Sequence, residues 1–194
     1  MSTAAEERAR AAELPEGDVI RILLEQHARI RDLFAEVQSA TDAQHKSETF
    51  DELRALLAMH ETAEEMVLRP VSSQSAGKEV TDARNEEEAE ANKVLVELEK
   101  LDVSSPDFDH QLAEFEKSVS DHAEAEETQE FPEVLSSADE KARVRMGTML
   151  TTAEKTAPTH PHPSAAGSPT AQWIAGPFAS LLDHAKDALQ KAAS

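Results

Sequence analysis

The 194-residue chain contains no cysteine and no tyrosine, and only five of its residues are glycine. Without cysteine it cannot form a disulfide, a thiolate metal site or an iron–sulfur cluster, and it has no thiol nucleophile. Any bound metal must therefore be held by histidines and carboxylates. The absence of tyrosine excludes a tyrosyl-radical mechanism. Because glycine is scarce while Ala, Glu, Leu and Lys are abundant, we expect an all-α protein.

Basic residues are also scarce, with 19 Lys and Arg against 39 Asp and Glu, which gives a formal net charge of −20. Binding to phosphates depends on clustered Lys and Arg, so neither nucleic acid nor an anionic membrane surface is an expected partner. The first 16 residues lack the apolar stretch of a signal peptide, and no apolar run is long enough to span a bilayer. We therefore expect a soluble cytoplasmic protein with no transmembrane segment.

The string His-x-x-x-Glu-Glu occurs twice, and a proline follows ten positions after each histidine. The two copies are His60, Glu64, Glu65 and Pro70, then His122, Glu126, Glu127 and Pro132. In a helix the first and fifth residues of the string lie one turn apart on the same face, so an imidazole nitrogen and a carboxylate oxygen can converge on one metal ion. The apolar residues upstream of each string lie on the same helix face as its histidine and glutamate. This pattern predicts that both pairs point into a helical core.

The repeat extends to the helices that precede the two strings. The segment from Glu25 matches the segment from Glu86 at an offset of 61, with apolar positions coinciding and His27 falling on Glu88. The second His-x-x-x-Glu string lies 62 positions after the first, so the halves differ by one residue, which a loop can absorb. The chain is predicted to be a duplicated helical hairpin that carries ligand-capable residues on all four helices.

These patterns predict an up-down antiparallel four-helix bundle, because the connections between its helices are short. The expected helices are Val19 to about Ala40 with Asp18 as N-cap, Glu48 to Arg69 stopped by Pro70, Asp82 to Leu101 capped by Thr81, and Pro106 to Glu130 preceded by Ser105. A capping box at Ser137-Ala138-Asp139-Glu140 predicts a fifth helix. The expected divisions are a flexible N-terminus (1–17), the bundle (18–135), the accessory helix (136–156), a Pro-rich linker (157–169) and an amphipathic C-terminal helix (170–194).

Six residues fall on the core-facing stripes of the four bundle helices: His27, His60, Glu64, Glu88, His122 and Glu126. Burying three carboxylates and three imidazoles without a cation is costly, and a bound metal removes that cost. Six ligands exceed the four that one zinc ion takes. A non-haem di-iron centre fits better, with Glu64 and Glu126 as the natural bridges. The strings lack the second histidine of zinc proteases and the Glu-x-x-His of ferritin-type sites.

The segments EQHARIRDLF, LLAMHETAEEMVLRP and VSDHAEAEETQEFPEV resemble the hemerythrin-like family of HHE cation-binding domains over residues 18 to 135. The tail is similar to the C-terminal extension of actinobacterial members. One position departs from the family pattern, because Glu88 stands where the third helix would carry a histidine. Glu88 either ligates as a carboxylate or leaves that position open, and Glu87 is the alternative if the helix register slips. A carboxylate there would favour Fe(III) over Fe(II), so reversible O₂ carriage is less expected than peroxide turnover.

The resemblance implies two functions that use the same ligands. One is an enzyme that decomposes H₂O₂ in a catalase-like way, and the other is a non-catalytic module that binds or senses O₂, NO or iron. A third alternative is an acidic interaction bundle whose metal site has lapsed. For the C-terminal stripe the alternatives are docking on its own bundle, forming a homodimer or another partner contact, and lying on a membrane surface.

Overall fold

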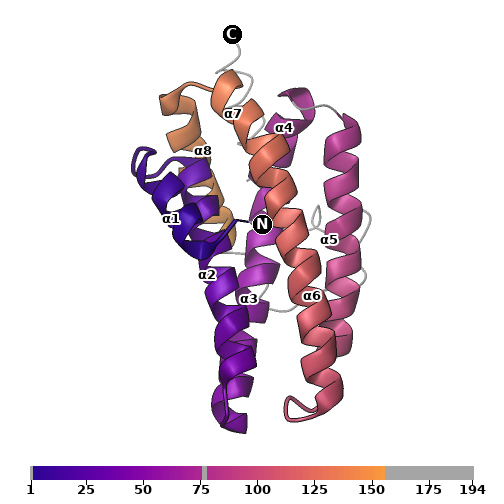
Figure 1. Cartoon of the computed structure of the whole chain (residues 1–194). Coiled ribbons are helices and arrows are strands. Elements are labelled where there is room, and N and C mark those ends of the chain that lie inside the picture. Colours follow the sequence, from indigo (N-terminus) through magenta and orange to yellow (C-terminus); the bar gives the residue numbers. More distant parts are fainter. Residues whose placement is uncertain (1, 76–77, 156–194) are drawn as a thin grey trace.

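A computed structural model describes residues 2–75 and 78–155, and in this part of the chain the secondary structure is helical throughout. Four long helices run up and down and form the body of the molecule (Figure 1). They are α2 (Val19–Ser39), α3 (Ala43–Val67), α5 (Lys78–Leu98) and α6 (Pro106–Ala125). The predicted all-α, up-down four-helix bundle is confirmed.

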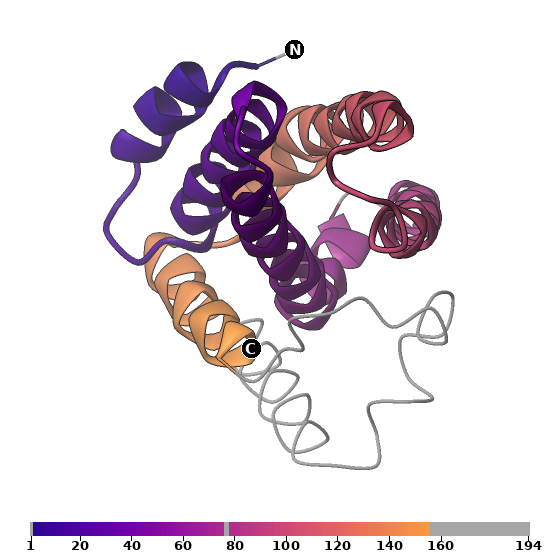
Figure 2. The same cartoon turned by 90° about the horizontal axis from the view of Figure 1, so that it is seen from below.

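Shorter elements complete the fold at the ends and sides of the bundle. They are α1 (Ala4–Ala12), α4 (Arg69–Ser75), the π-helical turn η1 (Glu126–Glu130), α7 (Phe131–Ser137) and α8 (Glu140–Glu154). Seen along the bundle, α1 and α8 lie against the outside of the four-helix body, α1 beside α2, and α8 beside α2 and α3 (Figure 2).

Side-chain caps fix where several helices begin. Asp18 accepts a hydrogen bond from the backbone N–H of Ile20 at 3.0 Å, so the predicted N-cap of α2 is confirmed. Ser105, which precedes α6, accepts one from the N–H of Phe108 at 3.2 Å and is the N-cap of that helix. Each satisfies a helix N–H that would otherwise have no partner, which is worth about 1 kcal/mol. The start of α3 was predicted too late, because the helix is capped by Asp42 and begins at Ala43, five residues before Glu48.

Two other predicted caps are wrong. Thr81 lies inside α5, which begins at Lys78. Ser137 is the last residue of α7, and the N-cap of α8 is Asp139, whose carboxylate accepts from the N–H of Ala142 at 2.7 Å. The accessory helix itself is present as predicted.

The N-terminus holds a helix where sequence analysis predicted a flexible segment. Thr3 and Glu6 form a capping box at the start of α1, in which the Thr3 hydroxyl accepts from the Glu6 N–H and the Glu6 carboxylate accepts from the Thr3 N–H. Ala11 is buried against the bundle. The N-terminal segment therefore contributes to the packed core.

Helix α8 is held close to the beginning of α2. Arg143 Nε donates to the Asp18 carboxylate at 2.7 Å, so α8 contacts the residue that caps α2. Gly147 lies so close to the backbone carbonyl of Gly17 that an added Cβ would come within 2.0 Å of that oxygen. Gly17 has a φ of +79°, a conformation that favours glycine, so this contact depends on glycine on both sides.

The prolines that follow the two His-x-x-x-Glu strings are accommodated differently. A proline inside a helix removes a hydrogen bond and clashes with the preceding turn. In the first half the helix ends at Val67 and restarts as α4, which includes Pro70 and continues to Ser75. In the second half the helix continues into α7 through the π-turn η1, which precedes Pro132.

The buried apolar side chains form two clusters at different levels of the bundle, and the predicted ligands lie between them. On α2, Leu24 belongs to one cluster and Ile30 to the other, with His27 between them. On α3 the order is Leu57, His60 and Ala63. A polar layer therefore crosses the middle of an otherwise apolar core.

The predicted linker (157–169) and C-terminal helix (170–194) lie outside the described residues. Among the helices that are described, none is both long enough and apolar enough to cross a membrane.

Candidate metal centre

All six residues predicted as ligands meet in the polar layer. They form two groups, and within each group one potential ligand atom per residue lies within 4.8 Å of the others. The first group is His27, His60, Glu64 and Glu126, and the second group is Glu64, Glu88, His122 and Glu126. Glu64 and Glu126 belong to both, as expected of residues that join two neighbouring positions.

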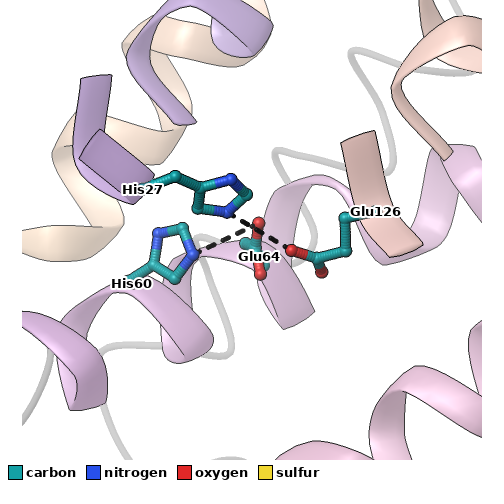
Figure 3. Close-up of side chains that lie close together, drawn as sticks. All are labelled: His27, His60, Glu64 and Glu126. Atoms are coloured by element: carbon teal, nitrogen blue, oxygen red, sulfur yellow. Dashed lines mark ion pairs between the residues drawn. The ribbon is translucent and has the colours of Figure 1, made fainter. Parts of the chain in front are cut away.

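The side chains of the first group point toward one another from α2, α3 and η1 (Figure 3). His27 Nε2 lies 3.4 Å from Glu126 Oε2, and His60 Nε2 lies 3.6 Å from Glu64 Oε1. In the second group His122 Nε2 lies 3.2 Å from Glu126 Oε1 and 3.8 Å from Glu88 Oε1. Five of the six residues are almost fully buried, and His122 is 16% exposed.

Many of the inward atoms lack a hydrogen bond. Within the described part of the chain no partner is found for His27 Nε2, His122 Nε2, both oxygens of Glu64, Glu88 Oε2 and Glu126 Oε2. Buried polar atoms are normally satisfied, and those left without partners call for an explanation. Imidazole and carboxylate lone pairs that converge without partners suit a cation, and two such groups sharing two carboxylates suit two cations.

Each of the three histidines is oriented by a hydrogen bond through its other ring nitrogen. Nδ1 of His27 donates to Glu127 Oε1 at 2.9 Å, Nδ1 of His60 donates to Gln26 Oε1 at 2.8 Å, and Nδ1 of His122 donates to Glu87 Oε2 at 2.9 Å. A bond of this kind fixes the tautomer and leaves the Nε2 lone pair for a metal.

Residues outside the four-helix body form hydrogen bonds with two of these acceptors, Glu127 and Gln26. The Glu127 carboxylate also accepts from Arg10 of α1 at 2.5 Å and from the Ser2 hydroxyl at 3.1 Å. The Gln26 amide donates to Glu154 of α8. Glu127 follows the ligand Glu126 directly in the sequence, and its carboxylate lies beside His27.

The charges of the histidines differ although all three lie in the same layer. Burial lowers the pKa of His60 to about 3, so this ring is neutral at neutral pH. Burial also disfavours charge on His27 and His122, but nearby carboxylates outweigh it and raise both pKa values, that of His122 strongly. Glu126 and Glu127 have this effect on His27, while Glu126, Glu87 and Glu88 have it on His122.

The two shared carboxylates are also unequal. Burial and the charge of Glu126 raise the pKa of Glu64 well above its ordinary value, which favours the protonated form of Glu64 when no cation is bound. Burial opposes ionisation of Glu126 too, but His122 and Arg69 outweigh it and hold the Glu126 pKa well below its ordinary value. The metal-free layer thus keeps its charge balanced with protons that a metal would replace.

Sequence analysis missed a cation at the edge of the layer. Arg69, the first residue of α4, is buried, and its Nη2 donates to Glu88 Oε1 and, at 2.5 Å, to Glu126 Oε1. Its Nη1 donates to both oxygens of Glu130 at 2.9 Å. The sequence contained one signal that a cation was needed there. Glu130 lies four residues after Glu126, so a further carboxylate occupies the same helix face as the ligand.

The register of α5 distinguishes Glu88 from Glu87. Glu88 is 4% exposed and lies in the second group, whereas the Glu87 side chain is 42% exposed and contacts His122 from outside that group. His45 and His110 are exposed at the surface and belong to neither group.

A cavity of about 30 Å³ adjoins the layer between α2, α3, α5 and α6. Its lining is mainly apolar and includes Phe34, Leu57 and Val119, together with His27 and His122. One water needs roughly 10–15 Å³ of such space, so the cavity has room for a molecule of a few atoms beside the ligand groups.

Comparison with known proteins agrees with this arrangement. The chain is 24% identical over 172 residues to an uncharacterised hemerythrin-like protein of Schizosaccharomyces pombe, a match that covers 87% of this chain and 85% of that protein. It is 31% identical over 114 residues to a DNA nickase of Nostoc, covering 59% of this chain but only 32% of that protein. No solved structure matches significantly.

The profile of the Hemerythrin HHE cation binding domain matches residues 18–134. This range contains both groups and the four bundle helices that carry them. The chain belongs to the hemerythrin HHE family, whose domain binds metal cations, typically iron.

Proposed function

We propose that the protein is a non-haem di-iron protein in which His27, His60, Glu64, Glu88, His122 and Glu126 hold the metal. The observation that carries this proposal is the pair of ligand groups sharing Glu64 and Glu126. A site for one ion would not need two sets of inward atoms, and the absence of sulfur ligands argues against structural zinc.

The reaction that we propose is the catalase-like disproportionation of hydrogen peroxide, in which two H₂O₂ give two H₂O and one O₂. Bound iron would supply the electron transfer by cycling between oxidation states. The protein would admit peroxide to the cavity beside the ligands and limit the water around it with the apolar side chains of Phe34, Leu57 and Val119. We assign proton transfer to Glu61, a carboxylate of the cavity lining that belongs to neither ligand group.

A second candidate is a non-catalytic module that binds O₂, NO or iron. The small and mainly apolar cavity favours it, because such a space also accommodates a diatomic gas. Both candidates fit a cytoplasmic protein. The homodimer that we propose through residues 170–194 rests on the apolar stripe of that segment in the sequence.

The test is the metal content of the full-length protein after anaerobic loading with Fe(II), followed by measurement of O₂ released from added H₂O₂. We expect about two iron ions per chain and peroxide-dependent O₂ release. His60→Ala and His122→Ala should each remove most of the iron and the O₂ release. His110→Ala is the matched control, because this histidine is 76% exposed on α6 and far from either group.

The outcomes separate the two candidates. Two irons with O₂ release support the enzyme, whereas two irons that bind NO without releasing O₂ from peroxide support the binding module. A protein that stays metal-free, or that holds a single tightly bound zinc, contradicts both. Equal iron loss in all three histidine variants would contradict the ligand assignment.

A further inference from the structure

The two ligand groups differ in what already occupies them, and the difference comes from Arg69. Its guanidinium is buried and contacts four carboxylates, with Nη2 beside Glu88, Glu126 and Glu64 and Nη1 on Glu130. A guanidinium stays charged in proteins, so it is a permanent cation in this layer.

Arg69 uses oxygens of the second group. Its Nη2 donates to Oε1 of Glu88 and Oε1 of Glu126, the same two atoms that lie nearest His122 Nε2. In the first group, His27 faces the other oxygen of Glu126, Oε2, which has no hydrogen-bond partner among the described residues. The Glu126 oxygen that faces His27 in the first group is therefore open to a cation, whereas the two oxygens that face His122 in the second group already bind one.

A metal ion in the second group would be close to this guanidinium. Metal–carboxylate bonds are about 2 Å long, and Arg69 Nη2 lies 2.5 Å from Glu126 Oε1, so two cations on that oxygen would be less than about 5 Å apart. Like charges at this distance in a buried layer repel each other strongly. Occupation of the second group must then weaken or break the bonds from Arg69 to Glu88 and Glu126.

We propose that Arg69 competes with the metal for the second group, so that the two metal positions fill in order, the first group before the second. This inference rests on the proposed two-metal site and specifies how that site is loaded. Arg69 contributes no ligand atom. It is a positioning residue, because its positive charge binds the carboxylates of Glu88 and Glu126 that a metal would need.

Glu130 provides the place where Arg69 remains when its other bonds are lost. Its carboxylate accepts from Nη1 with both oxygens and belongs to neither ligand group. The π-turn η1 carries both Glu126 and Glu130 into the interior, so the two carboxylates that share Arg69 come from one turn of one helix. Glu130 should therefore favour loading of the second group by stabilising the displaced guanidinium.

The repeat supports this asymmetry. At the offset of 62 that relates the two His-x-x-x-Glu strings, Arg69 corresponds to Phe131, and each residue directly precedes its proline. Phe131 stacks on the His27 ring at 5.7 Å, next to the first group. Equivalent positions thus place an uncharged ring beside one group and a permanent cation beside the other.

The experiment is an anaerobic calorimetric titration of the metal-free, full-length protein with Fe(II). In the parent protein we expect two binding steps, the second at least about tenfold weaker than the first, within the usual range of coupling between sites. Arg69→Gln should strengthen the second step by about tenfold or more and change the first by less than about threefold. Arg29→Gln is the matched control, since Arg29 also pairs with two carboxylates, Glu36 and Glu52, but on the surface.

Glu130→Gln separates competition from a merely structural role. Competition predicts opposite effects, with Arg69→Gln strengthening the second step and Glu130→Gln weakening it by about tenfold. A structural role predicts that both variants weaken both steps. Glu130→Gln also keeps the test decisive if Arg69→Gln fails to fold, because Arg69 then retains Glu88 and Glu126 as partners.

The results distinguish this inference from the proposed function. Two equal steps in the parent, or a second step that neither variant changes, overturn the competition while leaving a two-metal site intact. A parent protein that binds no Fe(II) overturns both. A second step that Glu130→Gln strengthens also refutes the role assigned to Arg69.

Discussion

Metal uptake should release protons, because the metal-free layer holds protons that ligands must lose. The pKa values of His27 and His122 are raised by neighbouring carboxylates, and that of Glu64 is raised by burial and by Glu126. His60, with a pKa of about 3, holds no proton at neutral pH. Burial also raises the pKa of Glu88. Loading both groups should therefore release protons.

The sign and size of the pH dependence follow from these directions. A group whose pKa is raised keeps its proton to higher pH, so metal binding strengthens as pH rises toward that pKa and levels off above it. Each released proton changes the overall binding constant about tenfold per pH unit, or about 1.4 kcal/mol.

The assay is a titration with Fe(II) under argon in two buffers of different ionisation enthalpy, which yields the number of protons released. Glu64→Gln should release about one proton fewer, because an amide carries none to lose. Glu25→Gln, an exposed change of the same kind on α2, should match the parent. Binding without proton release, or affinity that is constant between about pH 6 and 8, would falsify the charge assignment.

Two further variants test the supports of the layer. Gln26→Leu removes the acceptor that orients His60 and should weaken metal binding about 10- to 100-fold. Gln38→Leu, on the exposed face of α2, is the control and should leave metal binding unchanged. Equal metal affinity in the two variants would contradict the role of Gln26. Gly147→Ala places a Cβ 2.0 Å from a backbone oxygen, so it should lower the free energy of unfolding, measured in urea, by about 1–3 kcal/mol. The control is Thr148→Ala at an exposed position of α8, which should cost about 0.5 kcal/mol. A loss for Gly147→Ala no larger than that of the control would refute the close packing of α8.

Local patterns were enough to predict the bundle and the residues that meet in its core. The spacing of His60 and Glu64, repeated in the second half, places both side chains on one helix face, and the caps Asp18 and Ser105 mark helix starts by chemistry confined to a few residues. The helix at the N-terminus was also within reach, since Thr3 and Glu6 have the spacing of a capping box.

Other features depend on contacts between distant segments. A proline signals that a helix is disturbed but not how, and Pro70 breaks its helix while Pro132 follows a π-turn. The partners of Arg69 come from α5 and η1, which no local pattern connects to α4. Which acid of the Glu86-Glu87-Glu88 run faces inward was likewise decided by how α5 packs on α6.

The π-turn has a consequence for protein engineering. Because η1 carries one residue more per turn than an α-helix, deleting a single residue between Glu126 and Phe131 would let this turn wind as an ordinary α-helix while the helix after it kept its orientation. Phe131 would then stay beside His27, and the ligand string before the deletion would keep its register. A deletion within α6 has no extra residue to remove and would rotate everything after it by about 100°. The π-turn is therefore the place in this helix where the chain can be shortened without rotating a ligand.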